Sequence, residues 1–379
     1  MVRNMGLAAG ERIVVEPDYV VINNNHNRVW LEVFKEKVVN PHKFNVVIDH
    51  YVPSGDPMYT RDMSELYRVS KQFGFSYTYG KGMADQYMSE TLELSGKLIA
   101  TTSPYFGVYA AEGGVGIQVN DRQLQQLMYD GVFHYIVPQI IKVDFTGELS
   151  NGVTTTDVGL FLVKLLQEHK GRKAIVFGSK MKDLFNKNEQ LIILSMMSET
   201  AAVSVEYADF EKADADIVVN LGAVEQVLAL PESLSGIAEG CMLEKVSAMH
   251  YKPIDYVYLG GYIGGNIEAL RKAATMVAGK HIHLGTRMNI SPLSANVYLQ
   301  ALEEGLIDRF IEFGAQIIPS GDHSELLQGA GVMGHNEVGI STGFSNYTSC
   351  LGGRNTTLYI AAPQVAVQAA VDGFIGEDK

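Results

Sequence analysis

Cysteine is scarce in this chain, whose 379 residues include only Cys241 and Cys350. Two cysteines cannot build a disulfide framework, a four-cysteine zinc site or an iron–sulfur cluster held by cysteine sulfur. Basic residues are also few, with 30 lysines and arginines against 43 aspartates and glutamates and a formal net charge of −13. Nucleic acid is therefore not an expected partner, because neutralising phosphates requires a basic surface.

Long apolar runs are missing as well. No stretch reaches the roughly 20 residues of a membrane span, and the N-terminal segment has no continuous apolar core of the kind found in secretory signals. We therefore expect a cytoplasmic protein with no membrane partner. A GxxxxGK[ST] loop is absent, and no glycine-rich segment forms a dinucleotide fingerprint with its downstream acid, which argues against a Rossmann-type oxidoreductase.

Short β-rich runs alternate with helical patterns along the whole sequence. Strands are expected at residues 12–23, 44–52, 96–103, 135–147, 173–179, 215–222, 255–261 and 281–287. Helices are expected at residues 62–74, 154–171, 188–202, 266–279 and 294–314. This alternation predicts an α/β fold with mostly parallel sheets. Ligands of such sheets bind in loops beyond the carboxyl ends of the strands, as in the glycine-rich "GGYIGGN" at 260–266.

Four segments resemble, in chain order, the large subunit of isopropylmalate isomerase in the aconitase family. They are "VVIDHYVPSGD" (46–56), "GVTTTDVGLFLVKLL" (152–166), "SMMSETAA" (195–202) and the C-terminal third from "IDYVYLGGYIGGN" (254–266) onward. The resemblance covers essentially the whole chain. It implies three pseudo-repeated α/β subdomains at 1–150, 151–250 and 251–379, the third carrying the former cluster-binding loops. It also implies that the family's swivelling domain is a separate small subunit.

Members of that family dehydrate and rehydrate hydroxy-di- or tricarboxylates at a [4Fe–4S] cluster held by three cysteines. Here the first cysteine position falls on Tyr262. The paired positions fall on Gly321 and Ser324 or, with a one-residue shift, on Asp322 and Glu325. With no thiolate at these positions, no [4Fe–4S] cluster is expected, and a divalent metal ion or no metal takes its place.

Other family positions are also altered. The family's D-S-H-T loop reads Thr102, Ser103, Pro104 and Tyr105, and one family histidine is replaced by Asp85. The resemblance places Ser345 at the position of a substrate-binding arginine, with Asn346 in register. The positions that match the family's motifs are Asp49, His50, Asp157 and Glu199.

The predicted catalytic residues are four. A histidine beside a carboxylate suits acid–base work, which singles out His50 with Asp49. Glu199 has apolar neighbours and should need a partner if it is buried, so it is a candidate base or supporting group. Asp85 completes the set. The alternatives are an inherited structural hydrogen bond for His50, an exposed or helix-terminal charge for Glu199 and a solvated loop acid for Asp85.

Oxygen and nitrogen ligands for a divalent ion are available in the same loops. The candidate metal ligands are His26, His50, Asp85 and His323. For the histidines in "NNNHN" and "SGDHSE", the alternative is an exposed polar turn.

Substrate binding is predicted from residue types that recognise carboxylates. A guanidinium matches a carboxylate with two hydrogen bonds, which favours Arg287 and Arg354 unless they form surface ion pairs. Tyr262 would fill the volume of a missing cluster, either facing ligand or simply filling space. The full predicted set is Ser103, Tyr262, Arg287, Ser345, Asn346 and Arg354.

Two functions follow from these residues. The first is a cluster-free lyase acting on a small anionic hydroxy acid, or its unsaturated product, in specialised biosynthesis. The second is a non-catalytic binding or scaffold protein that descends from such a large subunit.

Overall fold

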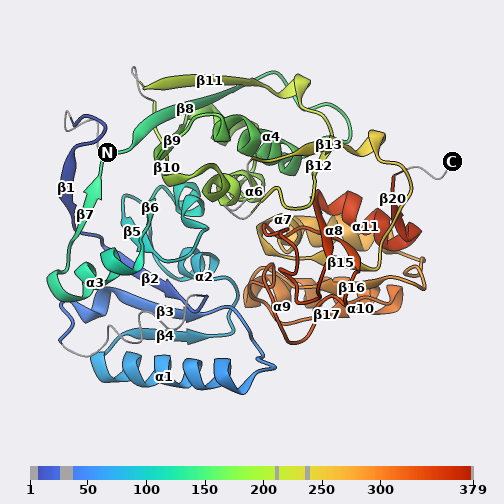
Figure 1. The fold of residues 1–379 in the computed structure, drawn as a ribbon, viewed down its shortest axis with the longest axis horizontal. Coiled ribbons are helices and arrows are strands. Elements are labelled where there is room, and N and C mark those ends of the chain that lie inside the picture. The colour runs from blue at the N-terminus through green and yellow to red at the C-terminus, as the bar shows by residue number, and fades with distance from the viewer. Residues whose placement is uncertain (1–6, 26–36, 210–212, 235–239, 377–379) are drawn as a thin grey trace.

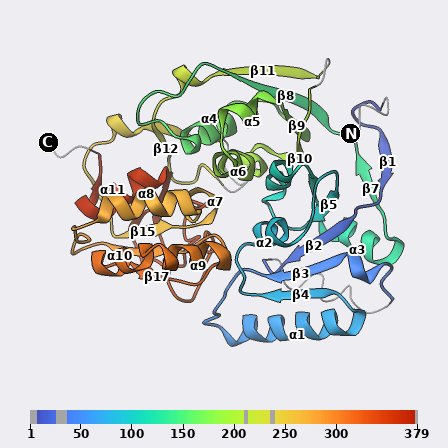
Figure 2. The same cartoon turned by 180° about the vertical axis from the view of Figure 1, so that it is seen from behind.

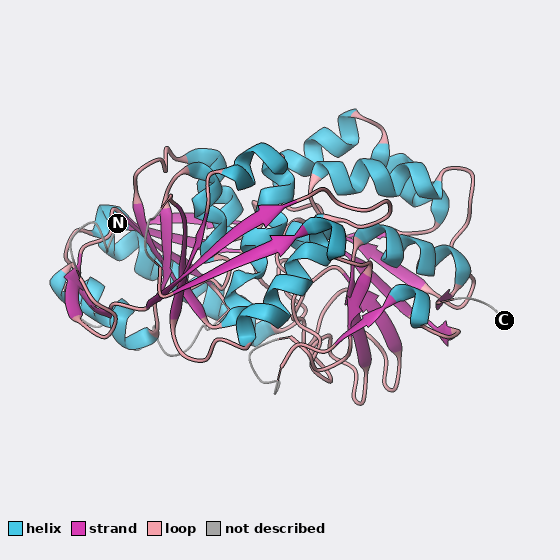
Figure 3. Ribbon diagram, turned by 90° about the horizontal axis from the view of Figure 1, so that it is seen from above, coloured by secondary structure: helices cyan, strands magenta, loops and turns pink. Residues whose placement is uncertain are grey.

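Two large β-sheets organise the computed structural model, which describes residues 7–25, 37–209, 213–234 and 240–376. The first lobe, built on a nine-stranded sheet, and the second lobe, built on a seven-stranded sheet, lie side by side (Figure 1). The same pairing is visible from behind (Figure 2), and helices lie between the two groups of strands when seen from above (Figure 3). In the described part of the chain, no helix is long and apolar enough to cross a bilayer.

The first sheet has the strand order β11-β8-β9-β10-β6-β5-β2-β3-β4. Its strands are β2 (Tyr19–Asn23), β3 (Phe44–Ile48), β4 (Ser76–Tyr79), β5 (Leu98–Thr101), β6 (Val115–Gln118), β8 (Gln139–Thr146), β9 (Lys173–Phe177), β10 (Ala202–Tyr207) and β11 (Ala215–Asn220). All neighbours are parallel except β6 and β10, which meet antiparallel at Ser204 and Ile117. That junction separates two parallel groups of strands within one sheet.

The second sheet has the order β13-β12-β19-β18-β15-β16-β17. Its strands are β12 (Val227–Ala229), β13 (Leu243–Lys245), β15 (Tyr256–Leu259), β16 (Arg287–Ile290), β17 (Gln316–Ile317), β18 (Val338–Ser341) and β19 (Thr357–Ala361). The five strands from β19 to β17 are parallel. Two small antiparallel pairs complete the strands, β1 (Arg12–Val15) with β7 (Phe133–Ile136) and β14 (Lys252–Pro253) with β20 (Phe374–Ile375).

Helices flank both sheets. They are α1 (Pro57–Phe73), α2 (Ala84–Thr91), α3 (Asp121–Asp130), α4 (Thr155–Gln167), α5 (Lys180–Leu184), α6 (Lys187–Ser195), α7 (Gly261–Gly264), α8 (Ile267–Val277), α9 (Ala295–Glu303), α10 (Leu306–Phe313) and α11 (Pro363–Asp372). One apolar core runs from the first lobe into the second, because Tyr262, Ile263 and Phe344 pack in the same buried cluster as Val158 and Leu162 of α4. The mostly parallel α/β architecture predicted from the sequence is confirmed.

Proline divides two of the predicted strands. The run at 12–23 is two strands separated around Pro17, and the run at 135–147 is two strands separated around Pro138. Proline has no N–H to donate to a ladder, so each run changes partner at that residue. In both cases one half joins the β1–β7 pair and the other half joins the large sheet.

Three further predicted boundaries were wrong. The helix at 294–314 is split at Gly305, which adopts a left-handed conformation with φ 67°. The helix at 188–202 ends at Ser195, continues as a 3₁₀ turn from Met196 to Thr200, and gives way to β10 at Ala202. The strand at 281–287 in fact begins where it was expected to end, at Arg287. The division into 1–150, 151–250 and 251–379 stays a prediction, since the two sheets group the strands differently.

The segment from β15 to α8 is a tight turn in which glycine is required. A Cβ on Gly264 would lie 2.2 Å from Oγ1 of Thr342 and 2.8 Å from Cδ1 of Leu259. Thr342 cannot easily move, because its hydroxyl accepts a 2.8 Å hydrogen bond from the Gly260 N–H and donates one of 2.9 Å to the Gly260 carbonyl. The turn therefore packs directly against the end of β18.

Replacing Gly264 with alanine is expected to lower the free energy of unfolding by about 1–3 kcal/mol, the usual cost of overpacking a core. Urea unfolding would measure the loss. Gly285→Ala is the matched control, because its new Cβ would meet its nearest neighbour at an ordinary 3.4 Å. Equal stability of both variants would show that the turn has room for a side chain.

Candidate functional site

Asp49 and His50 follow β3 directly and are both buried. The backbone N–H groups of the two residues each donate a 2.9 Å hydrogen bond to Oδ1 of Asn24, which follows β2. The Asp49 carboxylate lies 2.6 Å from the imidazole Nδ1 of His50 through Oδ1, and its Oδ2 accepts a 2.9 Å hydrogen bond from the Ala84 N–H. The orientation of the imidazole ring is therefore set by groups from three elements.

A second carboxylate reaches the same ring from the other lobe. Oδ2 of Asp322, which lies beyond β17, is 3.5 Å from Nε2 of His50, and the Asp322 N–H donates a 2.9 Å hydrogen bond to the Asp49 carbonyl. Asp322 is fixed by the Tyr105 hydroxyl, which donates to Oδ2 at 2.8 Å, and by the Ser324 hydroxyl, which donates to Oδ1 at 2.6 Å. The result is an Asp49–His50–Asp322–Tyr105 chain that crosses between the lobes.

These carboxylates determine the charge of the histidine. Burial lowers the pKa of His50, but the negative charges of Asp49 and Asp322 outweigh burial and raise it to about 9. Burial in turn raises the pKa of Asp322, yet the His50 imidazolium and the hydrogen bonds from Ser324 and Tyr105 bring it below its ordinary value. At neutral pH the centre therefore holds a cation between two anions.

Asp85 begins α2 and is completely buried. Burial raises its pKa to about 6, against the opposing effect of hydrogen bonds from Ser103 and Thr101. The Thr101 hydroxyl donates to Oδ1 of Asp85 at 3.2 Å. The nearby charge of Asp49 also raises the pKa of Asp85, so the two predicted carboxylates do lie in one neighbourhood.

Three aromatic rings fill the space next to this chain of residues. Tyr105 packs against Tyr262 with ring centroids 5.4 Å apart and against Phe344 with centroids 5.3 Å apart. We call Tyr105, Tyr262 and Phe344 the aromatic plug. The Tyr262 ring is fully buried, and its hydroxyl makes no hydrogen bond within the described structure.

A cavity of about 250 Å³ opens beside His50 and the aromatic plug. It is lined by Asn25, His50, Pro104, Tyr105, Gln118, Ser198, Glu199, Asp322, Ser324, Glu325, Phe344 and Ser345. Its charged lining residues are one histidine and three carboxylates, and no lysine or arginine lines it among the described residues. Ser345 donates its hydroxyl to the Glu325 carboxylate, so the serine at the family's arginine position points to another acid.

The predicted arginines lie elsewhere. Arg287 binds both carboxylate oxygens of Glu337 at 2.9 and 2.6 Å, which is the surface ion pair given as its alternative. Arg354 is exposed and does not line the cavity. Asn346 is buried and structural in its contacts, because its amide donates to the Leu230 carbonyl at 2.7 Å and its Oδ1 accepts from the Leu234 N–H at 2.9 Å.

The predicted metal ligands do not gather around one point. Within the described ranges, no group of three or more histidine, cysteine, aspartate or glutamate side chains is arranged to hold a metal ion. His50 has a carboxylate beside each ring nitrogen, and Nε2 of His323 lies 2.9 Å from the Pro319 carbonyl. Asp85 does not line the cavity, and His26 lies outside the described residues.

Sequence comparison now identifies the family. The profile of the aconitase family (aconitate hydratase) matches residues 18–208 and 223–373, most of the chain. The chain belongs to the aconitase family. It is 25% identical to 3-isopropylmalate dehydratase large subunit 1 of Thermotoga maritima over 400 residues, covering 98% of this chain and 95% of that one. It is also 25% identical to the homoaconitase large subunit of Thermus thermophilus, covering 97% of this chain and 92% of that one.

The fold agrees with that family. The crystal structure of Thermococcus kodakaraensis aconitase X in its holo-form matches 90% of this chain and 86% of its own, with a TM-score of 0.53 and 13% identity. At this identity the likeness concerns the fold alone. The family resemblance read from the sequence is thus confirmed.

The resemblance placed Tyr262 and, in its shifted alignment, Asp322 at cluster-ligand positions, and the structure connects these two residues through Tyr105. Tyr262 contacts Tyr105, whose hydroxyl binds Asp322. None of these side chains is a thiol. Burial raises the pKa of both Cys241 and Cys350 to about 12, and the Cys350 thiol faces the Ser345 carbonyl at 3.5 Å. The residues of this site therefore do not fit a cluster ligated by cysteine.

Tyr105 and Asn24 are site residues that the sequence did not single out. Tyr105 and Asp322 are 217 positions apart in the sequence, so no local sequence pattern predicts their contact. Asn24 follows a strand end, which is the signal that could have identified it.

His50 is expected to stay protonated well above neutral pH. In spectra of the chain with ¹³C-labelled histidine, the signal that His50→Gln removes should titrate near 9. Since this pKa is above the unfolded value of about 6.5, the stabilisation from His50 is complete below pH 6.5 and is lost as pH rises to about 9, an effect of about 3 kcal/mol.

Asp49→Asn is the informative second variant, because it keeps the shape of the side chain and removes one negative charge. It should lower the pKa of His50. A His50 signal that titrates at or below 6.5 in the unsubstituted protein would contradict the charge assignment.

Proposed function

We propose that this chain is a cluster-free lyase of the aconitase family. It adds water to, or removes it from, a small anionic hydroxy acid or its unsaturated product, in a specialised biosynthetic reaction. The position of His50 between Asp49 and Asp322, beside the 250 Å³ cavity, is the observation that carries the proposal. The names of the dehydratase and homoaconitase relatives support the reaction type.

His50 has the position and charge of a general acid. In the dehydration direction its Nε2 proton passes to the leaving hydroxyl, the C–O bond breaks and water departs. A carboxylate of the cavity wall, Glu199 or Glu325, takes the proton from the carbon next to the substrate carboxylate, and the electron pair of that C–H bond forms the double bond. Asp49 keeps the ring oriented, and Tyr105 holds Asp322 in place.

A partner subunit follows from the charge of the cavity. An anionic substrate would enter a space lined by Glu199, Asp322 and Glu325, with His50 as the cation among the described lining residues. Such a substrate needs further positive charge, and we propose that a separate small swivelling-domain subunit supplies it. The relatives are themselves named large subunits, which supports this arrangement.

The second candidate function is a non-catalytic binding or scaffold protein. The aromatic plug favours it, because Tyr262 fills part of the space beside the acid–base chain and leaves its hydroxyl without a partner. The retained acid–base chain and the open cavity favour the lyase.

Metal analysis tests the cluster-free proposal directly. We expect the protein, purified without exposure to oxygen together with any small subunit, to contain no stoichiometric iron or labile sulfide, because no cysteine faces the site. Elemental analysis of the same sample would also reveal a bound divalent ion such as Mg²⁺ or Zn²⁺. Iron and sulfide in stoichiometric amounts would refute the proposal.

His50→Gln is expected to lower kcat by about 10²- to 10⁴-fold, the typical contribution of a positioned general acid. Activity would be followed by the ultraviolet absorbance of the unsaturated acid, with a panel of hydroxy acids and the small subunit present. His134→Gln, at an exposed histidine of β7, is the control and should leave kcat unchanged. Full activity of His50→Gln would exclude His50 as the acid, and no turnover of any panel member by the unsubstituted protein would favour the binding function.

A further inference from the structure

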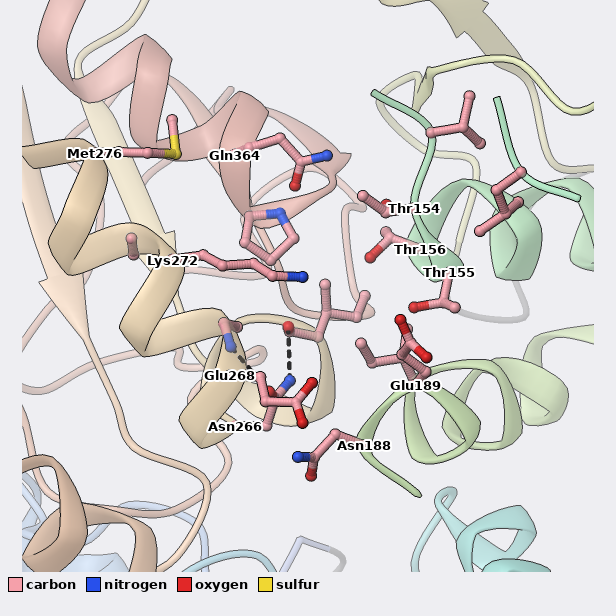
Figure 4. A pocket seen from close by; sticks show the side chains of 17 residues that line it. Thr154, Thr155, Thr156, Asn188, Glu189, Asn266, Glu268, Lys272, Met276 and Gln364 are labelled. Carbon is pink, nitrogen blue, oxygen red and sulfur yellow. Dashed lines mark hydrogen bonds between the residues drawn. The ribbon is translucent and has the colours of Figure 1, made fainter. Parts of the chain in front are cut away.

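A second cavity, of about 130 Å³, lies between the two lobes and shares no lining residue with the first (Figure 4). Its walls come from the N-terminal turns of α4, α6 and α11, from one face of α8, and from Ile263 of α7. Cavities at such junctions are common ligand sites when a few polar groups converge on an apolar lining. Both features are present here.

Positive charge reaches this interlobe cavity from two elements. Lys272 of α8 extends into it and forms no ion pair within the described part of the chain. The N-terminus of α11 lies at the same cavity, and a helix N-terminus carries partial positive charge. The N-terminus of α11 is uncompensated, since it has neither a capping side chain nor an acidic residue in its first turn.

A buried hydroxyl without a hydrogen-bond partner also points to a ligand in this cavity. Thr156 is 1% exposed, and its Oγ1 makes no hydrogen bond in the described structure. Figure 4 shows the Thr156 side chain and the Lys272 ammonium on opposite walls of the same space. Buried hydroxyls are nearly always hydrogen-bonded, so an oxygen of a bound molecule would satisfy Thr156.

Negative charge lines the cavity as well. Glu189 and Glu268 line the cavity, and each uses Oε2 to bind Asn186, at 2.9 Å to the backbone N–H and at 3.3 Å to the amide nitrogen. Their Oε1 atoms are left for another donor. These carboxylates would repel a simple anion. A molecule that carries both a negative and a positive group matches Lys272 as well as the two glutamates.

Between the charged sides the lining is apolar, with Leu149, Val153, Ile192, Ile263 and Met276. We propose that the interlobe cavity binds a small apolar α-amino acid. Its carboxylate lies toward Lys272, Thr156 and the N-terminus of α11, its ammonium lies toward Glu189 and Glu268, and its side chain contacts the apolar wall. This proposal does not rest on the proposed lyase function.

The ligand would act as an effector of the first site. Asn266 lines the interlobe cavity, and its amide donates to the carbonyls of Tyr262 at 2.9 Å and Ile263 at 3.1 Å. Tyr262 belongs to the aromatic plug beside His50. A molecule that contacts Asn266 and Ile263 therefore contacts the turn that positions the plug.

Isothermal titration calorimetry with valine as the probe tests the proposal on the full chain. Valine should bind saturably with one site per chain. N-acetylvaline lacks the ammonium and valinamide lacks the carboxylate, so each should bind at least about tenfold more weakly, the effect of losing one charge-assisted hydrogen bond. Glycine, alanine, leucine and phenylalanine would define the size limit.

Variants locate the site. Lys272→Met and Thr156→Val should each weaken valine binding, the former by about tenfold or more. Lys280→Met is the matched control, since Lys280 is an exposed lysine just beyond α8 that does not line this cavity. Saturable binding of no amino acid in the panel, equal binding of N-acetylvaline, or undiminished binding to a folded Lys272→Met variant would each overturn the proposal.

Discussion

The buried contact of His50 with Asp49 and Asp322 is the constraint on which the arrangement of the two lobes depends. Asp49 and His50 follow β3 of the first sheet, whereas Asp322 lies in the loop beyond β17 of the second, and the two backbones also pair at this point. Removing one partner of a buried ion pair typically costs about 3–5 kcal/mol, because the remaining charge stays unpaired. The lobes are thus tied together at the same residues that would perform catalysis.

This contact also decides what chemistry the site can do. An imidazole between two carboxylates stays protonated, so it can give a proton but cannot take one at neutral pH. The base must be a different group, which the carboxylates of the cavity wall provide. Because the described wall adds no second cation, the proposed anionic substrate would need positive charge from outside this wall, as the proposed small subunit would provide. In the proposed cluster-free reaction, positioning and proton transfer would have to do the work of an electrophilic metal.

The sequence predicted the parts of the site that lie at the ends of clear strands and failed where strand boundaries were misplaced. The apolar run before Asp49 and His50 belongs to the strand that the sequence predicted at 44–52, and it forms β3 in the structure. Arg287 was placed at the end of a strand, at the edge where ligands bind, but β16 begins there and the residue lies at the opposite edge. Contacts such as Tyr105 with Asp322 depend on the packing of whole lobes, which no short pattern encodes.

The glycine-rich turn at 260–265 explains how two cavities can be close and still chemically different. Tyr262 points its ring into the aromatic plug beside His50, while Ile263 and Asn266, one and four positions later, line the interlobe cavity. The turn can be this compact because Gly264 leaves no side chain against Thr342 and because a Cβ on Gly265 would lie 2.6 Å from the Ser291 carbonyl. A shift of the turn by a fraction of an ångström would therefore displace side chains both beside His50 and in the interlobe cavity, since close-packed interiors transmit small displacements. The turn at 260–265 is thus the physical link between the surroundings of His50 and the interlobe cavity.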